Sequence, residues 1–256
     1  MRISMAFACV FAAVSAADAT AQGTAGCNPE AVGSAAVRSI ADGRTLTLTD
    51  GRDVRLAGVE VPDEQGAAAR VALERLAAGQ DIRLLKMGPD ADRYGRFVGG
   101  VAGVDGKPIQ LELLNKGHVL VSGNAGRTGC AAAFLSAEKT ARSAGVGLWG
   151  TAYYAAKDAR DPKGILALRG RFAVVEGNVL SVRESGGTIY VNFGRRWTED
   201  FTVTALKRNE RTFSDAGLPL QKLEGRRVRI RGTVEERGGP WIEAMHPAQI
   251  EIVEQK

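Results

Sequence analysis

Basic and apolar side chains alternate near the C-terminal end of the sequence. Arg227, Arg229 and Arg231 are separated by Val228 and Ile230. Because successive side chains of a β-strand point to opposite faces, we expect the arginines to share one face and the two apolar residues the other. Such an arginine row can bind a polyanion, or it can be a solvated strand face.

A second cluster places an aromatic ring beside two positive charges, at Arg195, Arg196 and Trp197. Single-stranded nucleic acid is bound by basic grooves that carry aromatic rings, because every base has a face on which a ring can stack. We therefore predict a nucleic-acid-binding surface formed by the two clusters. The alternative is a core tryptophan beside solvated arginines. The formal net charge of +5 favours polyanionic partners.

The first 21 residues have the pattern of a secretory signal peptide. Arg2 is followed by an apolar run over residues 5–14, and residues 19–21 (ATA) have the small-residue pattern of a cleavage site. The run is too short to cross a bilayer as a helix, and no later segment resembles a membrane span. We therefore expect an exported protein, either periplasmic or secreted.

Removal of this signal peptide leaves two cysteines, Cys27 and Cys130. Disulfides form and persist in oxidising compartments, so we predict a bond between them. Lipid attachment at Cys27 is the alternative, because residues 24–27 loosely resemble a lipobox. Against it, Cys27 lies well beyond the apolar run, and Thr24 stands where an apolar residue is usual.

Turn residues and apolar periodicity divide the first half of the chain into strands and helices. An Asp-Gly pair at residues 50–51 predicts a hairpin turn. The expected strands are residues 46–49, 54–59, 81–86 and 97–104, and the expected helices are residues 63–78, 108–115 and 131–143.

Residues 151–169 are rich in alanine and charge, which predicts a connecting helix or linker. Strand patterns dominate residues 170–256, with one interposed helix, and this is typical of a small barrel of the OB-fold type. The predicted fold class is therefore mainly β with helices. The expected strands are residues 172–182, 188–193, 201–206, 227–234 and 248–253, with a short one at 241–242.

Other chemistries lack their sequence signals. His118 and His246 are isolated, with no nearby histidine or paired cysteines to indicate zinc. The glycine-rich residues 99–103 lie within an expected strand and lack the pattern of a phosphate-binding P-loop. No serine-centred hydrolase motif is present.

Five stretches of the first half together resemble a known family. They are residues 40–45 (IADGRT), 54–63 (VRLAGVEVPD), 92–96 (DRYGR), 114–117 (LNKG) and 145–149 (GVGLW). Residues 36–150 thus resemble the staphylococcal-nuclease-like (thermonuclease) domain along its whole length, after a lead-in at residues 22–35. The resemblance implies a β-barrel with three helices, followed by the OB-type extension seen in some bacterial members.

The resemblance also implies hydrolysis of phosphodiester bonds in DNA and RNA, usually with calcium. Arg55 and Arg96 take the positions of two arginines that hold the scissile phosphate and stabilise its developing charge. Asp63 takes the position of a carboxylate, usually Glu in the family, that positions or activates water.

A cation site made of acidic side chains and a backbone carbonyl is implied as well. Glu60 takes one acidic position, Val61 offers its carbonyl, and Asp42 lies close by. The family motif Asp-Gly-Asp-Thr has Arg44 at its third position in this chain. A guanidinium cannot ligate calcium, and a positive charge about 4 Å from the ion costs on the order of several kcal/mol. We therefore expect calcium or another divalent cation to bind weakly or not at all.

Three arrangements of Arg44 follow from this difference. Arg44 swings outward and leaves a weakened metal site, or it replaces the cation and holds phosphate, or hydrolysis is lost while phosphate binding remains. We predict an exported nuclease-like hydrolase with weakened or altered metal dependence. The alternatives are a catalytically inactive protein that binds nucleic acid or another anionic ligand, and a structural envelope protein. No feature predicts a protein partner.

Overall fold

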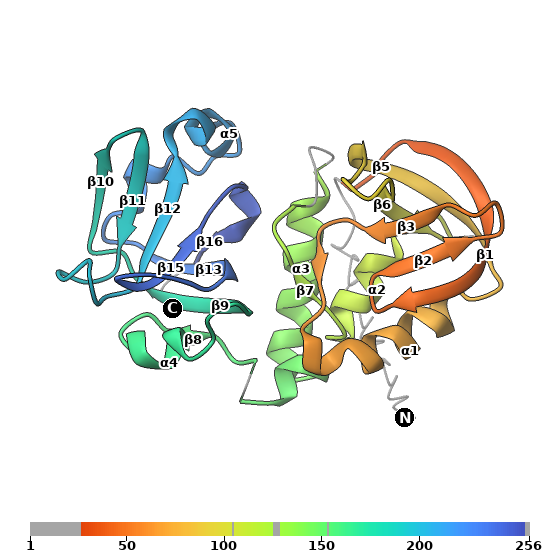
Figure 1. Ribbon diagram of the computed structural model, residues 1–256, viewed down its shortest axis with the longest axis horizontal. Helices are drawn as coiled ribbons and strands as arrows, with labels where there is room; N and C mark the ends of the chain where they lie inside the picture. Colours follow the sequence, from red (N-terminus) through yellow and green to blue (C-terminus); the bar gives the residue numbers. More distant parts are fainter. Residues whose placement is uncertain (1–26, 104, 125–128, 153, 254–256) are drawn as a thin grey trace, which may run out of the picture.

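The computed structural model describes residues 27–253 except 104, 125–128 and 153, and Figure 1 shows two domains side by side. We call residues 31–150 the barrel domain and residues 157–252 the second domain. The predicted signal peptide lies outside the described residues. Within the part of the chain described, no helix is long and apolar enough to span a membrane.

Five strands of the barrel domain close into a barrel in the order β1-β2-β3-β6-β5. Leu46 and Leu48 are fully buried while Thr47 is half-buried, so the expected alternation holds along β2. The predicted barrel is confirmed. The strands are β1 (Ala31–Asp42), β2 (Thr45–Leu48), β3 (Asp53–Leu56), β5 (Asp81–Ala91) and β6 (Phe97–Ala102).

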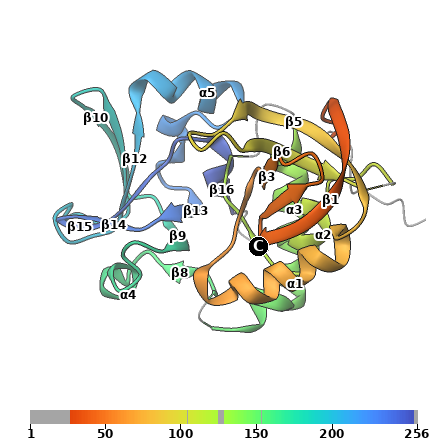
Figure 2. The same ribbon diagram turned by 45° about the vertical axis from the view of Figure 1, so that its right-hand side comes forward.

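Three α-helices pack on this barrel, as expected. They are α1 (Gly66–Ala77), α2 (Ile109–Asn115) and α3 (Cys130–Ala144), with short 3₁₀ turns η1 (Asp63–Gln65) and η2 (Gly147–Gly150). Figure 2 shows α1 running beneath the barrel strands, where its buried Leu73 joins the core. Phe134 of α3 is fully buried in the same core.

The predicted disulfide between Cys27 and Cys130 is present, across a sequence separation of 103 residues. It joins the start of the described chain to the first residue of α3, and both cysteines lie in the barrel core.

A two-stranded sheet lies beside the barrel. Its strands are β4 (Val59–Glu60) and β7 (Leu120–Val121), which pair antiparallel with Glu60 opposite Leu120. Figure 1 shows β7 and α3 on the side of the barrel domain that faces the second domain. This small sheet therefore lies on the side of the barrel that faces the second domain.

The second domain contains two sheets that share one hydrophobic core. The first has the order β10-β11-β12-β15-β14 and the second the order β16-β13-β9-β8. We expected a small closed barrel. The described strands form two separate sheets instead. The strands are β8 (Lys157–Asp158), β9 (Phe172–Asn178), β10 (Ser181–Ser185), β11 (Thr188–Asn192), β12 (Thr202–Leu206), β13 (Arg227–Thr233), β14 (Glu235–Arg237), β15 (Gly239–Glu243) and β16 (Ile250–Ile252).

Short helical segments complete the second domain. They are α4 (Pro162–Leu166), η3 (Lys207–Asn209), α5 (Glu210–Asp215), η4 (Leu220–Leu223) and η5 (Pro247–Gln249). Both β8 and α4 lie within the stretch expected to be a linker. Ile165 of α4 is fully buried in the second core, so this stretch is part of the second domain from residue 157 onward.

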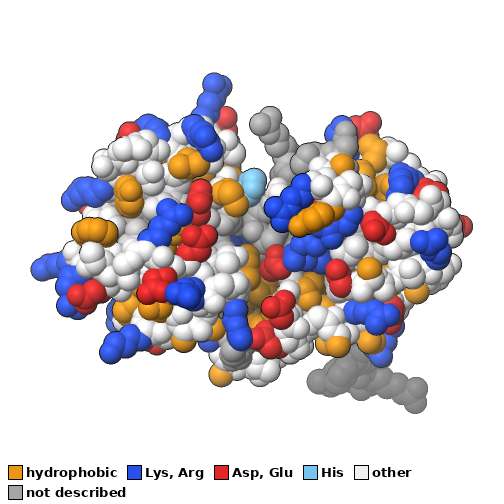
Figure 3. Space-filling model, viewed as in Figure 1, with side chains coloured by type: hydrophobic (Ala, Val, Ile, Leu, Met, Phe, Trp, Pro, Cys, Tyr) orange, Lys and Arg blue, Asp and Glu red, His pale blue; other side chains and the backbone are white. Residues whose placement is uncertain are grey.

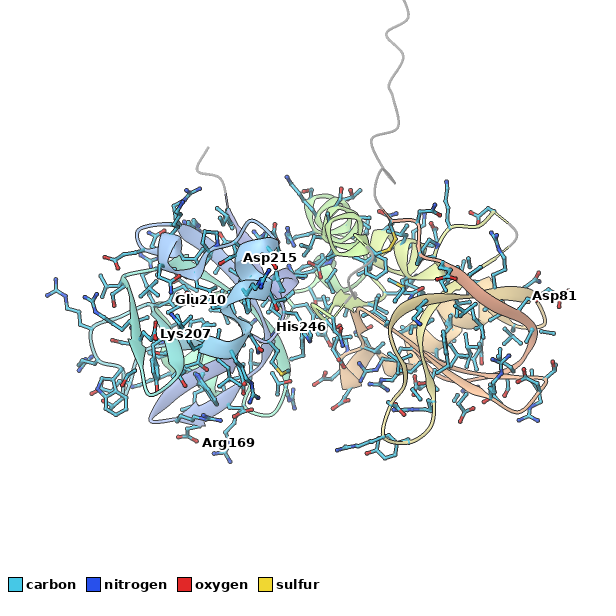
Figure 4. All side chains as sticks on the ribbon, turned by 90° about the horizontal axis from the view of Figure 1, so that it is seen from above. Asp81, Arg169, Lys207, Glu210, Asp215 and His246 are labelled. Carbon is cyan, nitrogen blue, oxygen red and sulfur yellow. A yellow bond between two sulfur atoms is a disulfide. The ribbon has the colours of Figure 1, made fainter. Side chains whose placement is uncertain are left out.

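The two domains share a third, smaller hydrophobic cluster. Leu120, Leu148 and Trp149 of the barrel domain pack there with Val174 of β9. In Figure 4, His246, which precedes η5, lies in the part of the second domain nearest the barrel domain. The domains are therefore in direct apolar contact.

Candidate functional site

The turn between β1 and β2 carries Arg44. The backbone N–H of Arg44 donates to Oδ1 of Asp42 over 2.8 Å, which closes the turn. At Gly43 a Cβ would lie 2.6 Å from the Cβ of Ala69 in α1, so a side chain does not fit there. The turn lies against α1, and Arg44 extends from a fixed backbone.

The side chain of Arg44 forms an ion pair with Glu60 of β4. Its Nη1 lies 2.5 Å from Oε2 of Glu60 and 3.4 Å from the carbonyl oxygen of Val59. The two side chains are only 21% and 24% exposed, so water screens the pair less than an ordinary surface pair. Arg44 therefore does not swing outward, which excludes the first of its three expected arrangements.

The residues expected to hold a divalent cation do not fit one. The carboxylate of Glu60 is engaged by Arg44, and Asp42 accepts the backbone N–H of the same residue. Val61 is half-buried against the barrel core, and Asp63 begins η1. In the described ranges, no group of three or more His, Cys, Asp or Glu side chains could hold a metal ion. The guanidinium of Arg44 is bound to the Glu60 carboxylate oxygen that a cation would need as a ligand.

Arg55 of β3 lies close to the Arg44–Glu60 pair. Strand pairing places Arg55 opposite Thr45, the residue after Arg44. Burial lowers the pKa of the Arg55 guanidinium, and the positive charges of Arg44 and Arg96 lower it further. The negative charges of Glu60 and Asp42 act in the opposite direction. Because these charges affect Arg55 together, the structure brings the two predicted phosphate-binding arginines to one place.

Arg96 is held in the turn between β5 and β6 by Asp92. Its Nη2 and Nε lie 2.6 Å and 2.8 Å from Oδ2 of Asp92. Oδ1 of Asp92 accepts the backbone N–H groups of Tyr94 and Arg96. The hydrogen bond from the Arg96 side chain is the main reason that the pKa of Asp92 lies below its usual value. Since β3 and β6 pair in parallel, this turn lies beside Arg55.

The exposed aromatic ring of Tyr94 lies next to Arg96. Tyr94 is not among the site residues predicted from the sequence. Tyr94 is 66% exposed, and the guanidinium carbons of Arg93 and Arg96 lie 4.8 Å and 5.1 Å from its ring centroid. The sequence does indicate this ring, because residues 92–96 (DRYGR) place a tyrosine between two arginines in an expected turn. Figure 3 shows Lys and Arg side chains gathered on the barrel domain beside its boundary with the second domain.

Asp63, expected to act on water, is exposed at the first residue of η1. Among the described hydrogen bonds and ion pairs, its carboxylate makes no contact with Arg55 or Arg96. Its neighbour Glu64 binds Arg171 of the second domain, with 2.6 Å between Oε1 and Nη1. Asp63 is therefore accessible to a ligand but is not held by either arginine.

The three alternating arginines of β13 do share one face, as the sequence predicts. Val228 and Ile230 are fully buried in the second core, on the opposite face. However, Arg231 is fully buried in an ion pair with Glu138 of α3. Arg229 binds Glu176 and Glu251, and Arg227 binds Glu176. The predicted nucleic-acid contact is therefore wrong for Arg229 and Arg231, because Glu176 and Glu251 of the neighbouring strands β9 and β16 engage Arg229 and α3 packs against Arg231.

The other predicted cluster lies in the loop between β11 and β12. Trp197 is 70% exposed, so it is not a core residue, whereas Trp241 is buried. Arg196 pairs with Glu199 in the same loop, and Arg195 is exposed. This loop is accessible to a partner, and it lies on the second domain away from the Arg55 site (Figure 1).

Comparison with known proteins adds two findings. Residues 53–151 match the family described as staphylococcal nuclease homologue, a match that begins after Asp42 and Arg44. The chain is also similar to the succinoglycan biosynthesis protein ExoI of Rhizobium meliloti (strain 1021), with 34% identity over 124 residues. The alignment covers 43% of this chain and 62% of that protein, so it spans less than two thirds of the relative.

Proposed function

Starting from the fact that residues 53–151 are a staphylococcal nuclease homologue domain, we propose that this domain binds and slowly hydrolyses phosphodiester groups of DNA or RNA without calcium. The observation that carries the proposal is the ion pair of Arg44 with Glu60, beside Arg55 and Arg96. Three guanidinium groups lie together, and Arg44 and Arg96 are paired with Glu60 and Asp92. Among the described ion pairs Arg55 has no carboxylate partner, although the charges of Glu60 and Asp42 act on it. A phosphate group would supply Arg55 with that partner.

In this proposal Arg55 and Arg96 hold the phosphate through charge-assisted hydrogen bonds. Arg44 supplies the positive charge that calcium supplies in related proteins. Asp63 takes a proton from the water that attacks phosphorus, and the ester oxygen leaves with a proton from the solvent. Because Asp63 is not held by a cation or an arginine, we expect this step to be slow.

The second candidate function is binding without hydrolysis. The exposed position of Asp63 and the engaged carboxylate of Glu60 favour it, since Glu60 is already bound to Arg44 and no described hydrogen bond or ion pair fixes the side chain of Asp63 beside Arg55 or Arg96. In this case the barrel domain holds nucleic acid or another anionic ligand. The exposed loop with Arg195, Arg196 and Trp197 supports either function, because it offers a second place for nucleic acid.

We also propose that the protein is exported, to the periplasm or beyond the cell. The pattern of residues 1–21 and the disulfide between Cys27 and Cys130 support this proposal. Fractionation of cells that express the full-length chain, followed by mass determination of the mature N-terminus, tests it. Retention of residues 1–21 in the cytoplasmic fraction would contradict export.

The decisive experiment measures binding and cleavage of labelled single-stranded DNA and RNA, with calcium and with chelator. For the wild type we expect salt-dependent binding and slow cleavage that the chelator does not abolish. Arg96→Ala removes charge-assisted hydrogen bonds worth about 1.5–3 kcal/mol, so affinity should fall about tenfold or more. Arg52→Ala is the matched control, because Arg52 lies in the same hairpin as Arg55 but pairs with exposed Asp50.

The variant Arg44→Asp separates the two candidates. If the wild type hydrolyses, the variant should convert chelator-resistant cleavage into calcium-dependent cleavage. If the wild type only binds, cleavage should occur in the variant alone and only with calcium. An absence of salt-sensitive binding in all variants would contradict both candidates and leave a structural envelope role.

A further inference from the structure

Glu60, which holds Arg44, lies on a strand that the barrel itself does not contain. Strand β4 pairs only with β7 in its two-stranded sheet, with Val59 opposite Val121. The backbone N–H of Ser122 extends this pairing, since it donates to the carbonyl oxygen of Gly58 over 3.0 Å. The position of Glu60 therefore depends on the position of β7.

Strand β7 is in turn held by a buried carboxylate. Oε1 of Glu138 accepts the backbone N–H of Val121 over 2.8 Å. Oε2 of the same carboxylate accepts Nη1 of Arg231 over 2.5 Å. Both Glu138 and Arg231 have 0% side-chain exposure. One carboxylate thus binds a strand of the barrel domain with one oxygen and an arginine of the second domain with the other.

Two further contacts join β7 to the second domain. Leu120 packs in the shared cluster with Val174 of β9. Gly123, just after β7, faces Gln249 so closely that a Cβ at position 123 would overlap its side chain. Figure 1 shows β7 and α3 at this boundary. The second domain therefore packs against the segment that carries β7 at Leu120 and Gly123, and it reaches Val121 through Glu138.

The side chains of Glu138 and Arg231 are fully buried, so water screens their attraction little. Oε2 of Glu138 also accepts Nη1 of Arg142, over a longer distance of 3.3 Å. Without Arg231 this longer contact alone would hold Oε2, and we expect the carboxylate to turn further toward Arg142 and away from the Val121 N–H. Arg231 therefore fixes the orientation in which Glu138 holds β7.

We propose that Arg231 of the second domain is a positioning residue for the candidate phosphate site. Through Glu138 it fixes β7, and through β7 it fixes Glu60 and the Arg44 guanidinium. The inference deepens the proposed function and rests on it for its effect on phosphate binding. The second domain then helps to position the phosphate site, in addition to any binding of nucleic acid by its own surface.

The test uses the full chain with Arg231→Met, Arg231→Lys and Glu138→Gln. The matched control is Glu176→Gln, because Glu176 also accepts an arginine of β13, but entirely within the second domain. Two quantities are measured: affinity for a labelled single-stranded oligonucleotide at fixed salt, and exchange rates of the Val121 and Ser122 amide protons. If Arg231→Met does not fold, the double variant Glu138→Gln/Arg231→Met replaces it, since it leaves no buried unpaired charge.

We expect Arg231→Met and Glu138→Gln to weaken oligonucleotide binding about two- to thirtyfold and to speed exchange of both amides. Arg231→Lys should recover part of each effect, and Glu176→Gln should leave both unchanged. Unchanged amide exchange in Arg231→Met overturns the inference, whatever happens to binding. Equal losses in Glu176→Gln would also overturn it, because the effect would then be general loosening.

The two proposals fail in different ways. If the wild type does not bind the oligonucleotide and Arg96→Ala changes nothing, the proposed function is wrong. Faster exchange in Arg231→Met alone would still support the positioning of β7. If Arg96→Ala abolishes binding while the Arg231 variants bind as the wild type does, the proposed function stands and the inference is wrong.

Discussion

A single residue, Arg44, determines the charge at the candidate site of the barrel domain. In the motif that residues 40–45 resemble, a second aspartate stands where this chain has Arg44, so a positive side chain faces Glu60. A guanidinium is always protonated and presents donors in a fixed plane, so it forms a directed contact with one carboxylate. A cation at the same place would instead require several oxygen ligands. We therefore infer that the site recognises an anion directly.

At the same scale, Asp92 gives a pH-dependent contribution to stability. Its hydrogen bond from Arg96 lowers its pKa below the usual 3.8. Because the folded pKa is depressed, the contribution is present above pH 3.8 and is lost as the pH falls further, through the folded pKa. We predict that Asp92→Asn lowers the urea midpoint at pH 6, and that this difference shrinks toward pH 2.

The control for this prediction is Asp215→Asn. Asp215 is highly exposed and lies 3.6 Å from Arg211, and exposed ion pairs contribute about 0–1 kcal/mol. Its substitution should change the midpoint little at any pH. A constant difference between the wild type and Asp92→Asn from pH 6 to pH 2 would contradict the proposed linkage.

Among the elements, the segment after β7 shows how closely the domains meet. Gly123 has φ +91°, and a Cβ there would overlap Gln249. Gly51 has nearly the same φ, +90°, but open space around it. Both Gly→Ala variants should lose about 1–3 kcal/mol from backbone strain. We predict that Gly123→Ala loses about 1–3 kcal/mol more, because of the overlap with Gln249.

Urea unfolding of the two alanine variants measures this difference directly. Since the backbone strain is nearly equal, the difference reports the contact between position 123 and Gln249. Equal losses in the two variants would show that Gln249 moves aside freely.

The sequence predicts the three helices and strands β2, β3, β5 and β6 of the barrel domain, but not β7 or the long strand β1, which begins within the expected lead-in at residues 22–35. The structure explains why the recognisable stretches are informative. The Gly117 carbonyl accepts the backbone N–H of Leu148 over 2.8 Å, and a side chain at Gly117 or Gly147 would collide with the opposite backbone. Two of the recognisable stretches, residues 114–117 and 145–149, thus meet in space. Their residue types are set by local backbone geometry, which a sequence pattern can capture.

The candidate site is only partly predictable by the same means. The resemblance to the nuclease-like family indicates Arg55, Arg96 and Glu60, but it does not tell which way Arg44 turns. On β13 the period-two pattern predicts a shared face for Arg229 and Arg231. It cannot predict that α3 covers this face, because the contact joins residues about a hundred positions apart. Long-range contacts of this kind depend on how complete domains pack.

For the whole molecule, the disulfide is a large constraint on the unfolded chain. Its loop of 103 residues implies a contribution of about 4–5 kcal/mol in the chain-entropy account. We predict that Cys27→Ala/Cys130→Ala lowers the free energy of unfolding by up to this amount. Urea unfolding of the variant, compared with the wild type with and without reductant, measures the effect. Equal stability in all three samples would contradict it.

The shared burial of Glu138 and Arg231 also limits how such a chain can be rearranged. Exchange of the second domain for an unrelated module would remove Arg231 and leave Arg142 as the one described cationic partner of Glu138. Separate expression of either half, or a partly melted form with one half intact, would break the same buried pair and uncover the apolar cluster that the halves share. We expect heating in a calorimeter to give one transition, with both halves losing their structure together.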